Sequence, residues 1–151
     1  MRYYIIAGEA SGDLHGSNLI KGIKEVDSCA QIRCWGGDLM KEAGGDLVKH
    51  YKEMSFFGFA NVLRNLKTIF SQIDECKRAI EQFAADVIIL IDYPSFNMRI
   101  AKWAHKKGIK VYYYIAPKVW AWKEWRVKSI RKYVDKVYTI FPFETEYFNS
   151  K

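Results

Sequence analysis

Short runs of apolar residues alternate along the chain with longer stretches in which apolar residues recur every three or four positions. The short runs predict buried strands, and the longer stretches predict amphipathic helices. We expect strands at 3–7, 31–35, 46–51, 86–91, 110–116 and 136–141. We expect helices at 13–26, 39–44, 59–83, 97–107, 124–133 and from 144 onward. Such an alternation is typical of a parallel sheet that helices cover on both faces.

The segments that follow the predicted strands are the first candidates for function, because ligands of parallel sheets bind beyond the carboxyl ends of the strands. The first such segment is GEASGDLHG at 8–16, whose three glycines favour a tight turn into a helix. A helix N-terminus can bind an anion, but this segment is neither GxGxxG nor a lysine-containing phosphate loop. The alternative is a plain turn in which Ser11 or Asp13 caps the helix.

The segment IDYPSFN at 91–97 places a carboxylate directly after the most strand-like run in the chain. Asp92 is therefore expected in the ligand crevice, where a carboxylate can act as a general base. Asn97 offers both a donor and an acceptor, which suits a ligand rich in hydroxyl groups. The alternative is that Asp92 caps the next helix and takes no part in chemistry. The residues alone leave both interpretations open.

Tryptophans and basic residues crowd the segment APKVWAWKEWRVKSIRK at 116–132. Trp120, Trp122 and Trp125 lie within six residues of one another, and six Lys and Arg residues surround them. Such a mixture can stack on nucleobases, pack against sugar rings or lie at a lipid surface. The structural alternative is that the indole rings pack onto the sheet. Packing alone does not readily explain three tryptophans within six residues.

An apolar helical stripe runs through SFFGFANVLRNLKTIF at 55–70. Its members are Phe57, Phe59, Val62, Leu63, Leu66, Ile69 and Phe70. Most such stripes face a core, but aromatic residues flanked by bases also suit a helix that lies in a membrane interface. In the last segment, FPFETEYF at 141–148, Glu144 falls in the first turn of a predicted helix, which favours a structural role.

The net charge of +7 over 151 residues suits three kinds of partner: nucleic acid, an anionic membrane surface or phosphorylated small molecules. The three cysteines form no CxxC pair, which favours reduced thiols in a cytoplasmic protein. The apolar runs are too short for a secretory signal or a membrane span, so any membrane contact is expected to be peripheral.

Four motifs taken together resemble the lipid-A-disaccharide synthases, a family of bacterial glycosyltransferases. GEASGD, IDYPSFN, PKVWAWKEWR and FPFE follow four predicted strands in that order, and the resemblance covers essentially the whole chain. It implies the GT-B architecture, in which two Rossmann-like domains face each other across a cleft. Residues 1–151 are then expected to be the N-terminal, acceptor-side domain, a three-layer α/β unit with a mostly parallel sheet. The UDP-sugar-binding domain is expected to lie outside this chain, which alone should be inactive.

The resemblance also implies a reaction. UDP-2,3-diacylglucosamine would donate its sugar to 2,3-diacylglucosamine 1-phosphate, forming a β(1→6) disaccharide and releasing UDP. Neither a metal nor a cofactor is implied, and the enzyme would be peripheral on the cytoplasmic face of the inner membrane. Asp92 matches the essential aspartate of the family. The expected substrate contacts are Gly8, Glu9, Ser11, Gly12, Asp13, Asn97, Trp120, Trp122 and Arg126.

Two alternatives remain. One is a different GT-B enzyme of sugar nucleotides, such as an epimerase or another lipid glycosyltransferase. The other is a basic nucleic-acid-binding domain, but the chain carries no recognised nucleic-acid motif, so no nucleic acid partner is expected. The sequence leaves open whether the chain forms a homo-oligomer.

Overall fold

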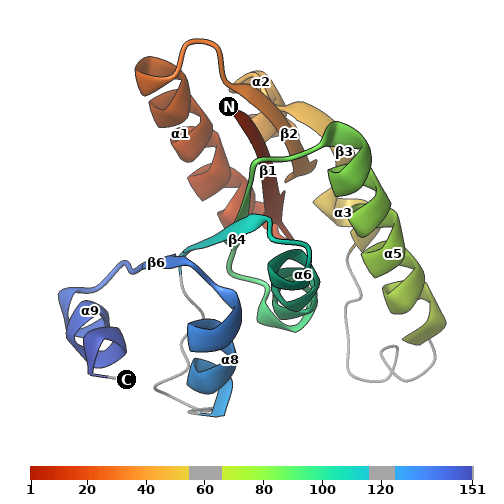
Figure 1. Cartoon of the computed structure of the whole chain (residues 1–151). Helices are drawn as coiled ribbons and strands as arrows, with labels where there is room; N and C mark the ends of the chain where they lie inside the picture. Colours follow the sequence, from red (N-terminus) through yellow and green to blue (C-terminus); the bar gives the residue numbers. More distant parts are fainter. Residues whose placement is uncertain (55–65, 116–124, 151) are drawn as a thin grey trace.

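The computed structural model describes residues 1–54, 66–115 and 125–150, and within them six strands form one sheet (Figure 1). The strands are β1 (Arg2–Ala7), β2 (Gln31–Gly36), β3 (Asp46–His50), β4 (Val87–Ile91), β5 (Lys110–Tyr114) and β6 (Lys136–Tyr138). Their order is β3-β2-β1-β4-β5-β6, and every neighbouring pair is parallel. The order reverses direction between β1 and β4, which is where ligands of such sheets bind.

Helices cover both faces of the sheet, as Figure 1 shows. On one face lie α1 (Ala10–Val26) and α2 (Asp38–Glu42), which pack on the sheet through Ile20 and Met40. On the other face lie α5 (Leu66–Phe83) and α6 (Pro94–Lys106), with α8 (Trp125–Tyr133) beside α6. Two shorter helices are α3 (Tyr51–Met54) and α9 (Pro142–Asn149). These layers confirm the predicted Rossmann-like α/β fold.

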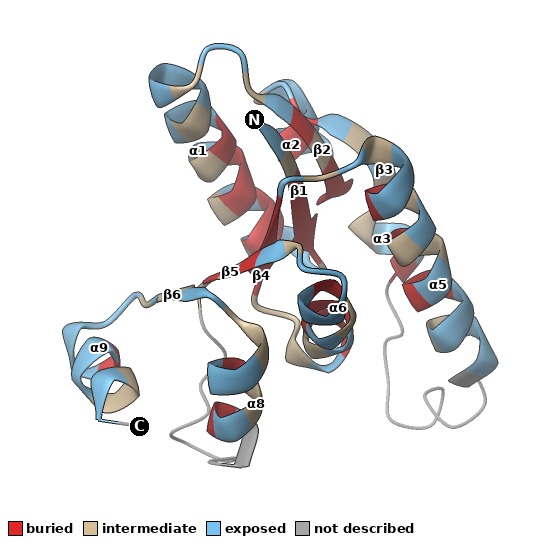
Figure 2. Ribbon diagram, viewed as in Figure 1, coloured by how far each residue is buried: buried red, intermediate tan, exposed pale blue. Residues whose placement is uncertain are grey.

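The core is built on the two central strands, which are red along most of their length in Figure 2. Side chains alternate along β1, so that Tyr4 and Ile6 pack toward α5 and α6 whereas Ile5 and Ala7 pack toward α1 and α2. All five residues of β4 are buried, because helices cover it on both sides. Burial of one large apolar side chain contributes about 1.5–3 kcal/mol, so this pair of strands holds the layers together.

Several predicted boundaries are wrong for reasons of local chemistry. Helix α1 begins at Ala10, three residues before the predicted start. Helix α6 begins at Pro94 rather than at residue 97, because proline is well suited to the first turn of a helix. Strand β6 ends at Tyr138 rather than at residue 141. The cause is the Glu144 carboxylate, which accepts the N–H groups of Ile140 and Phe141 at 3.2 Å and turns the chain into α9.

Two further differences concern the segments beside β3 and β5. Strand β5 ends at Tyr114 because Ile115 adopts a positive φ of 66°. The four residues of α3 were not predicted, since one helical turn is too short to show a period. The helix expected over 59–83 is present from Leu66, and its first part lies outside the described residues.

The three cysteines are free thiols. Cys34 and Cys76 are buried in the two halves of the core, whereas Cys29 is exposed. Burial raises the pKa of the Cys34 thiol to about 12 and raises that of Cys76 well above its ordinary value. Both buried thiols are therefore kept in the unreactive protonated form at neutral pH.

Candidate active site

The turn between β4 and α6 has an unusual backbone. Asp92 and Tyr93 follow each other with φ values of 44° and 45°, and neither is a glycine. Such left-handed residues cost about 1–3 kcal/mol each, and they persist only where the surroundings hold them. Tyr93 is the N-cap residue of α6, with Pro94 following in the first turn. The half-buried Asp92 therefore lies at the carboxyl edge of the sheet, in a turn that differs from a regular helix entry.

Two side chains hold this turn through its backbone. The amide nitrogen Nδ2 of Asn97 donates to the carbonyl oxygens of Ile91, at 3.2 Å, and Asp92, at 2.8 Å. The hydroxyl of Tyr113, which comes from the neighbouring strand β5, donates to the same Asp92 carbonyl. Asn97 is fully buried, so its amide is fixed in place by its surroundings. The side chain of Asn97, which was expected to contact a ligand, thus holds the backbone of the turn at Ile91 and Asp92.

Gly8, in the turn after β1, lies directly against the aromatic ring of Tyr93. A Cβ atom added to Gly8 would lie only 2.5 Å from Tyr93 Cγ, so only glycine fits here without a shift of the ring. The Tyr93 ring also stacks on Phe96 at 5.6 Å, and burial raises the pKa of its phenol. The turns after β1 and β4 thus pack together, which places Gly8 beside the strained Asp92 turn.

Replacing Gly8 by alanine should disturb the Asp92 turn. We expect a loss of stability of about 1–3 kcal/mol, since overpacking of this kind displaces neighbouring groups, together with reduced turnover. Gly22→Ala is the matched control, because a Cβ at Gly22, within α1, meets nothing within 4 Å. Alanine there should be neutral or stabilising by up to about 1 kcal/mol. Urea unfolding and initial rates of the intact protein would measure both effects, and equal behaviour of the two variants would contradict the proposed packing role.

Asp13 was considered as a cap of its own helix and as a substrate contact, but the structure gives it a different role. Its carboxylate is buried and accepts the N–H groups of Gly37 at 2.8 Å, Met40 at 3.0 Å and Leu39 at 3.1 Å. These groups lie at the start of α2, so Asp13 caps a neighbouring helix. The alternative in which Ser11 or Asp13 caps its own helix is wrong, because Glu9 is the N-cap residue of α1. Asp13 directs its carboxylate to α2, which corrects the expected substrate contact.

The rest of the first turn of α1 is divided between packing and exposure. Gly12 is buried, and an added Cβ would lie 3.1 Å from the Cβ of Ala7, so it serves the close approach of α1 to β1. Glu9 and Ser11 are exposed at the carboxyl edge, where the Ser11 hydroxyl donates to the Glu9 carboxylate. Of the predicted contacts in this segment, Glu9 and Ser11 are thus the ones with side chains open to a ligand.

Several predicted residues fall where side chains are not described. Trp120 and Trp122 lie outside the described residues, as do Phe57, Phe59, Val62 and Leu63. Arg126 belongs to α8 and Leu66 to α5, but neither side chain is described.

The rest of the predicted apolar stripe divides between core and surface. Ile69 packs against the core, whereas Phe70 is 48% exposed and lies under the Arg99 guanidinium, at 5.0 Å from ring centre to Cζ. Within the described ranges no helix combines the length and apolar character that a bilayer span requires.

Two features of the site carry no clear signal in the sequence. Tyr113 is one of three consecutive tyrosines, and only its place in β5 shows that its hydroxyl reaches Asp92. Ile115 has a positive φ although it is β-branched, and its N–H donates to the Tyr138 carbonyl at 3.0 Å. Strained residues thus end both β4 and β5, and the alternation of apolar residues could not have located either one.

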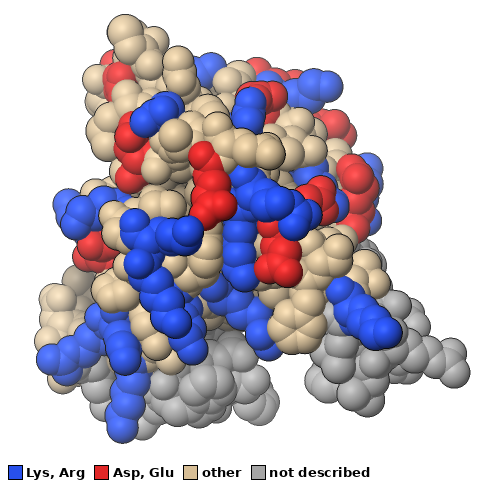
Figure 3. Space-filling model, turned by 45° about the vertical axis from the view of Figure 1, so that its right-hand side comes forward, with Lys and Arg blue, Asp and Glu red and all other residues tan. Residues whose placement is uncertain are grey.

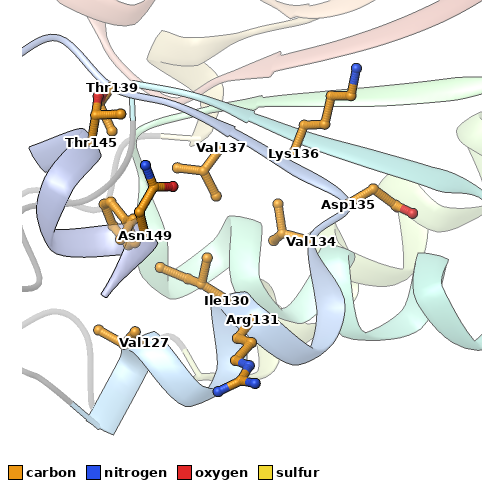
Figure 4. Close-up of a pocket in the computed structure, with 11 residues that line it drawn as sticks. Val127, Ile130, Arg131, Val134, Asp135, Lys136, Val137, Thr139, Thr145 and Asn149 are labelled. Carbon is orange, nitrogen blue, oxygen red and sulfur yellow. The ribbon is translucent and has the colours of Figure 1, made fainter. Parts of the chain in front are cut away.

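A groove of about 430 Å³ lies between α8, β6 and α9 (Figure 4). Its apolar wall consists of Val127, Ile130, Val134, Val137 and Phe148. Thr139 and Thr145 lie at its rim, with their hydroxyls 2.7 Å apart. The groove shares no residue with the Asp92 turn. Across 1–54, 66–115 and 125–150, no three His, Cys, Asp or Glu side chains gather where they could share a metal ion.

Comparison with known proteins identifies related sequences along nearly the whole chain. Residues 3–151 match the family model described as Lipid-A-disaccharide synthetase. A lipid-A-disaccharide synthase of Geobacter metallireducens is 45% identical over 147 residues, which cover 97% of this chain and 38% of the relative. One from Coxiella burnetii is 37% identical, over 97% of this chain and 39% of the relative. The chain thus spans about two fifths of the length of these curated relatives.

A solved structure shares the fold. The UDP-GlcNAc 2-epimerase of Neisseria meningitidis, bound to UDP-GlcNAc, aligns with a TM-score of 0.65 over 99% of this chain and 43% of that chain. The sequence identity is 10%, so the likeness shows the fold alone.

Proposed function

The chain belongs to the lipid-A-disaccharide synthetase family, and from this premise we propose that it forms the acceptor side of a lipid-A-disaccharide synthase. The proposed reaction transfers 2,3-diacylglucosamine from its UDP derivative to 2,3-diacylglucosamine 1-phosphate. The products are the β(1→6) disaccharide 1-phosphate and UDP. The UDP-sugar site is proposed to lie mainly in a second domain outside these 151 residues, so this chain alone would not turn over.

The observation that carries this proposal is the Asp92 turn. A half-buried carboxylate stands at the carboxyl end of central strand β4, in a strained turn that Asn97 and Tyr113 hold by its backbone. A plain helix cap would need no such support of its backbone. Strain held in place by surrounding groups is typical of functional sites.

In the proposed mechanism Asp92 accepts the proton of the acceptor 6-hydroxyl, directly or through one water. The oxygen attacks C1 of the donor sugar from the face opposite UDP, and the bond from C1 to the UDP oxygen breaks as the new bond forms. The electron pair leaves with UDP, and the configuration at C1 is inverted. The support of the Asp92 backbone would keep the carboxylate in reach of the hydroxyl, which is what a general base requires.

The substrate contacts are proposed around this base. Glu9 and Ser11, exposed in the first turn of α1, would bind sugar hydroxyls. Trp120, Trp122 and Arg126 would form the acceptor pocket, and a guanidinium such as that of Arg126 suits the 1-phosphate. The acyl chains would run toward 55–70 and the bilayer, and the exposed ring of Phe70 supports an apolar contact on that side.

The test is an activity assay on the intact protein that contains this chain. With UDP-2,3-diacylglucosamine and 2,3-diacylglucosamine 1-phosphate in detergent, we expect UDP and the disaccharide 1-phosphate as products. With UDP-GlcNAc in place of the donor, we expect no comparable turnover, because the acyl contacts are missing. Epimerisation of UDP-GlcNAc, or transfer that ignores the acyl chains, would overturn the proposal in favour of another GT-B enzyme.

A further inference from the structure

The positive charge of the chain is concentrated on two neighbouring helices. Helix α6 has 13 residues and α8 has nine, and neither contains an Asp or a Glu. Their basic residues are Arg99, Lys102, Lys106, Arg126, Lys128, Arg131 and Lys132. The whole chain has 24 Lys and Arg against 17 Asp and Glu, so removing these seven leaves 17 of each sign. The net charge of +7 is thus the charge of α6 and α8.

These basic side chains face solvent on the outer surface of one helical layer. Apart from Arg126, whose side chain is not described, all of them are exposed. Figure 3 shows Lys and Arg gathered toward the lower left, the part of this surface that α6 and α8 form. Arg99, Lys102 and Lys128 form no ion pair with any described carboxylate, whereas Lys107 and Lys110 nearby each pair with one. Lys102 and Lys128 are therefore available to an external anion.

A groove of about 430 Å³ runs between the two helices. Its lining consists of Pro94, Ser95, Met98, Arg99, Lys102, Ser129 and Tyr133. Two cations and two serine hydroxyls in one hollow suit a phosphate group, since each can donate a hydrogen bond to its oxygens. The groove includes Pro94 and Ser95, at the start of α6.

The groove also borders an exposed aromatic ring. Arg99, which lines it, stacks on Phe70 of α5, and that residue is 48% exposed. Surfaces that bind anionic membranes typically combine several basic side chains with an exposed aromatic ring. The basic side chains contact the lipid headgroups, and the ring inserts into the interface.

We propose that α6 and α8 form a docking face for an anionic lipid bilayer, with the groove between them receiving a phosphate-bearing headgroup. The proposal rests on the proposed function, since docking on this face brings the carboxyl edge of the sheet and Asp92 to the bilayer that would hold the acylated substrates. It adds an electrostatic surface to the apolar contact expected from 55–70.

Charge reversal on this face tests the proposal in the intact protein. We expect Lys102→Glu with Lys128→Glu to weaken binding to phosphatidylcholine vesicles that contain phosphatidylglycerol by about thirty-fold or more, since each basic residue near such a surface contributes a several-fold gain in affinity. Vesicles of phosphatidylcholine alone should bind wild type and variant equally weakly. Raising the salt concentration should reduce the difference between the two proteins.

The matched control reverses Lys21 and Lys41, which are exposed on α1 and α2 at the opposite face of the sheet. Both double variants have the same net charge. Equal loss of binding in the two would overturn the proposal, because binding would then follow net charge alone. Unchanged vesicle binding in both double variants would also overturn the proposal. Unchanged vesicle binding with lost binding to RNA would assign the face to nucleic acid instead, and circular dichroism would confirm that both variants fold.

Turnover in detergent separates this proposal from the proposed function. Since docking on a bilayer is not needed there, Lys102→Glu with Lys128→Glu should keep the detergent activity of the wild type. An intact wild-type protein without synthase activity would overturn the function while leaving the vesicle result to stand. An active enzyme whose vesicle binding ignores these two lysines would overturn the docking face alone.

Discussion

Replacing Asp92 by asparagine is expected to lower kcat by about 10²- to 10⁴-fold, the contribution typical of a general base. The amide cannot accept the proton of the acceptor hydroxyl, whereas the size of the side chain is kept. Asparagine also tolerates the left-handed backbone at φ 44° as well as aspartate does, so the turn should survive. Initial rates with the diacylated substrates, measured beside urea unfolding of the intact protein, would show lost turnover at unchanged stability.

Asp74→Asn is a suitable control for this experiment. Asp74 is an exposed carboxylate on α5 that pairs with Lys77 at 3.0 Å, away from the carboxyl edge of β4. Its loss should leave kcat unchanged, since surface ion pairs contribute about 0–1 kcal/mol to stability and this one touches no proposed site residue. If Asp92→Asn retained a near-normal kcat, the assignment of Asp92 as the base would be wrong.

The largest loss of stability is expected from Asp13→Ala. Three N–H groups at the start of α2 would lose their acceptor, and the bonds from Gly37 and Met40 are buried. Hydrogen bonds to a charged group contribute about 1.5–3 kcal/mol each, and partial access of water should reduce their combined loss to about 3–5 kcal/mol. This is a large part of the roughly 5–15 kcal/mol that stabilises a typical domain. Urea unfolding would measure the change.

Asp38→Ala is the control for Asp13→Ala. It shows how much stability is lost when a negative charge near the start of α2 is removed without breaking the buried hydrogen bonds. Asp38 is the first residue of α2, and its side chain is 72% exposed beside His50. Its removal should cost less than about 1 kcal/mol, the usual magnitude of an exposed charge at a helix terminus. A loss in Asp13→Ala no larger than in Asp38→Ala would show that the cap contributes little.

The sequence predicted the layers of the fold because those depend on local patterns. The apolar run that became β4 and the amphipathic stretch that became α5 each show their character within a few residues. The role of Asp13 could not be predicted in this way, because its partners lie 24–27 residues further along the chain. The same limit applies to Tyr113, whose contact with Asp92 depends on the pairing of β5 with β4.

The position of Asp92 at a strand end was predictable, but its backbone was not. Pro94 indicated a turn and the start of a helix, yet no residue between β4 and Pro94 is the glycine that positive φ usually requires. The strain is compensated by Asn97 of α6, by Tyr113 of β5 and by the packing of Gly8, in the turn after β1, on Tyr93. A local pattern contains no information about such support.

The sheet order also has a consequence for how the chain folds during synthesis. The first strand to be synthesised, β1, lies in the middle of the sheet. Its neighbour on one side is β2, and its neighbour on the other side is β4. On the ribosome β1 can pair with β2, and β2 with β3, early, whereas the other side of β1 must wait until Ile91 at the end of β4 has emerged. Until then the nascent chain presents an unpaired apolar strand edge, the kind of surface that chaperones shield from aggregation.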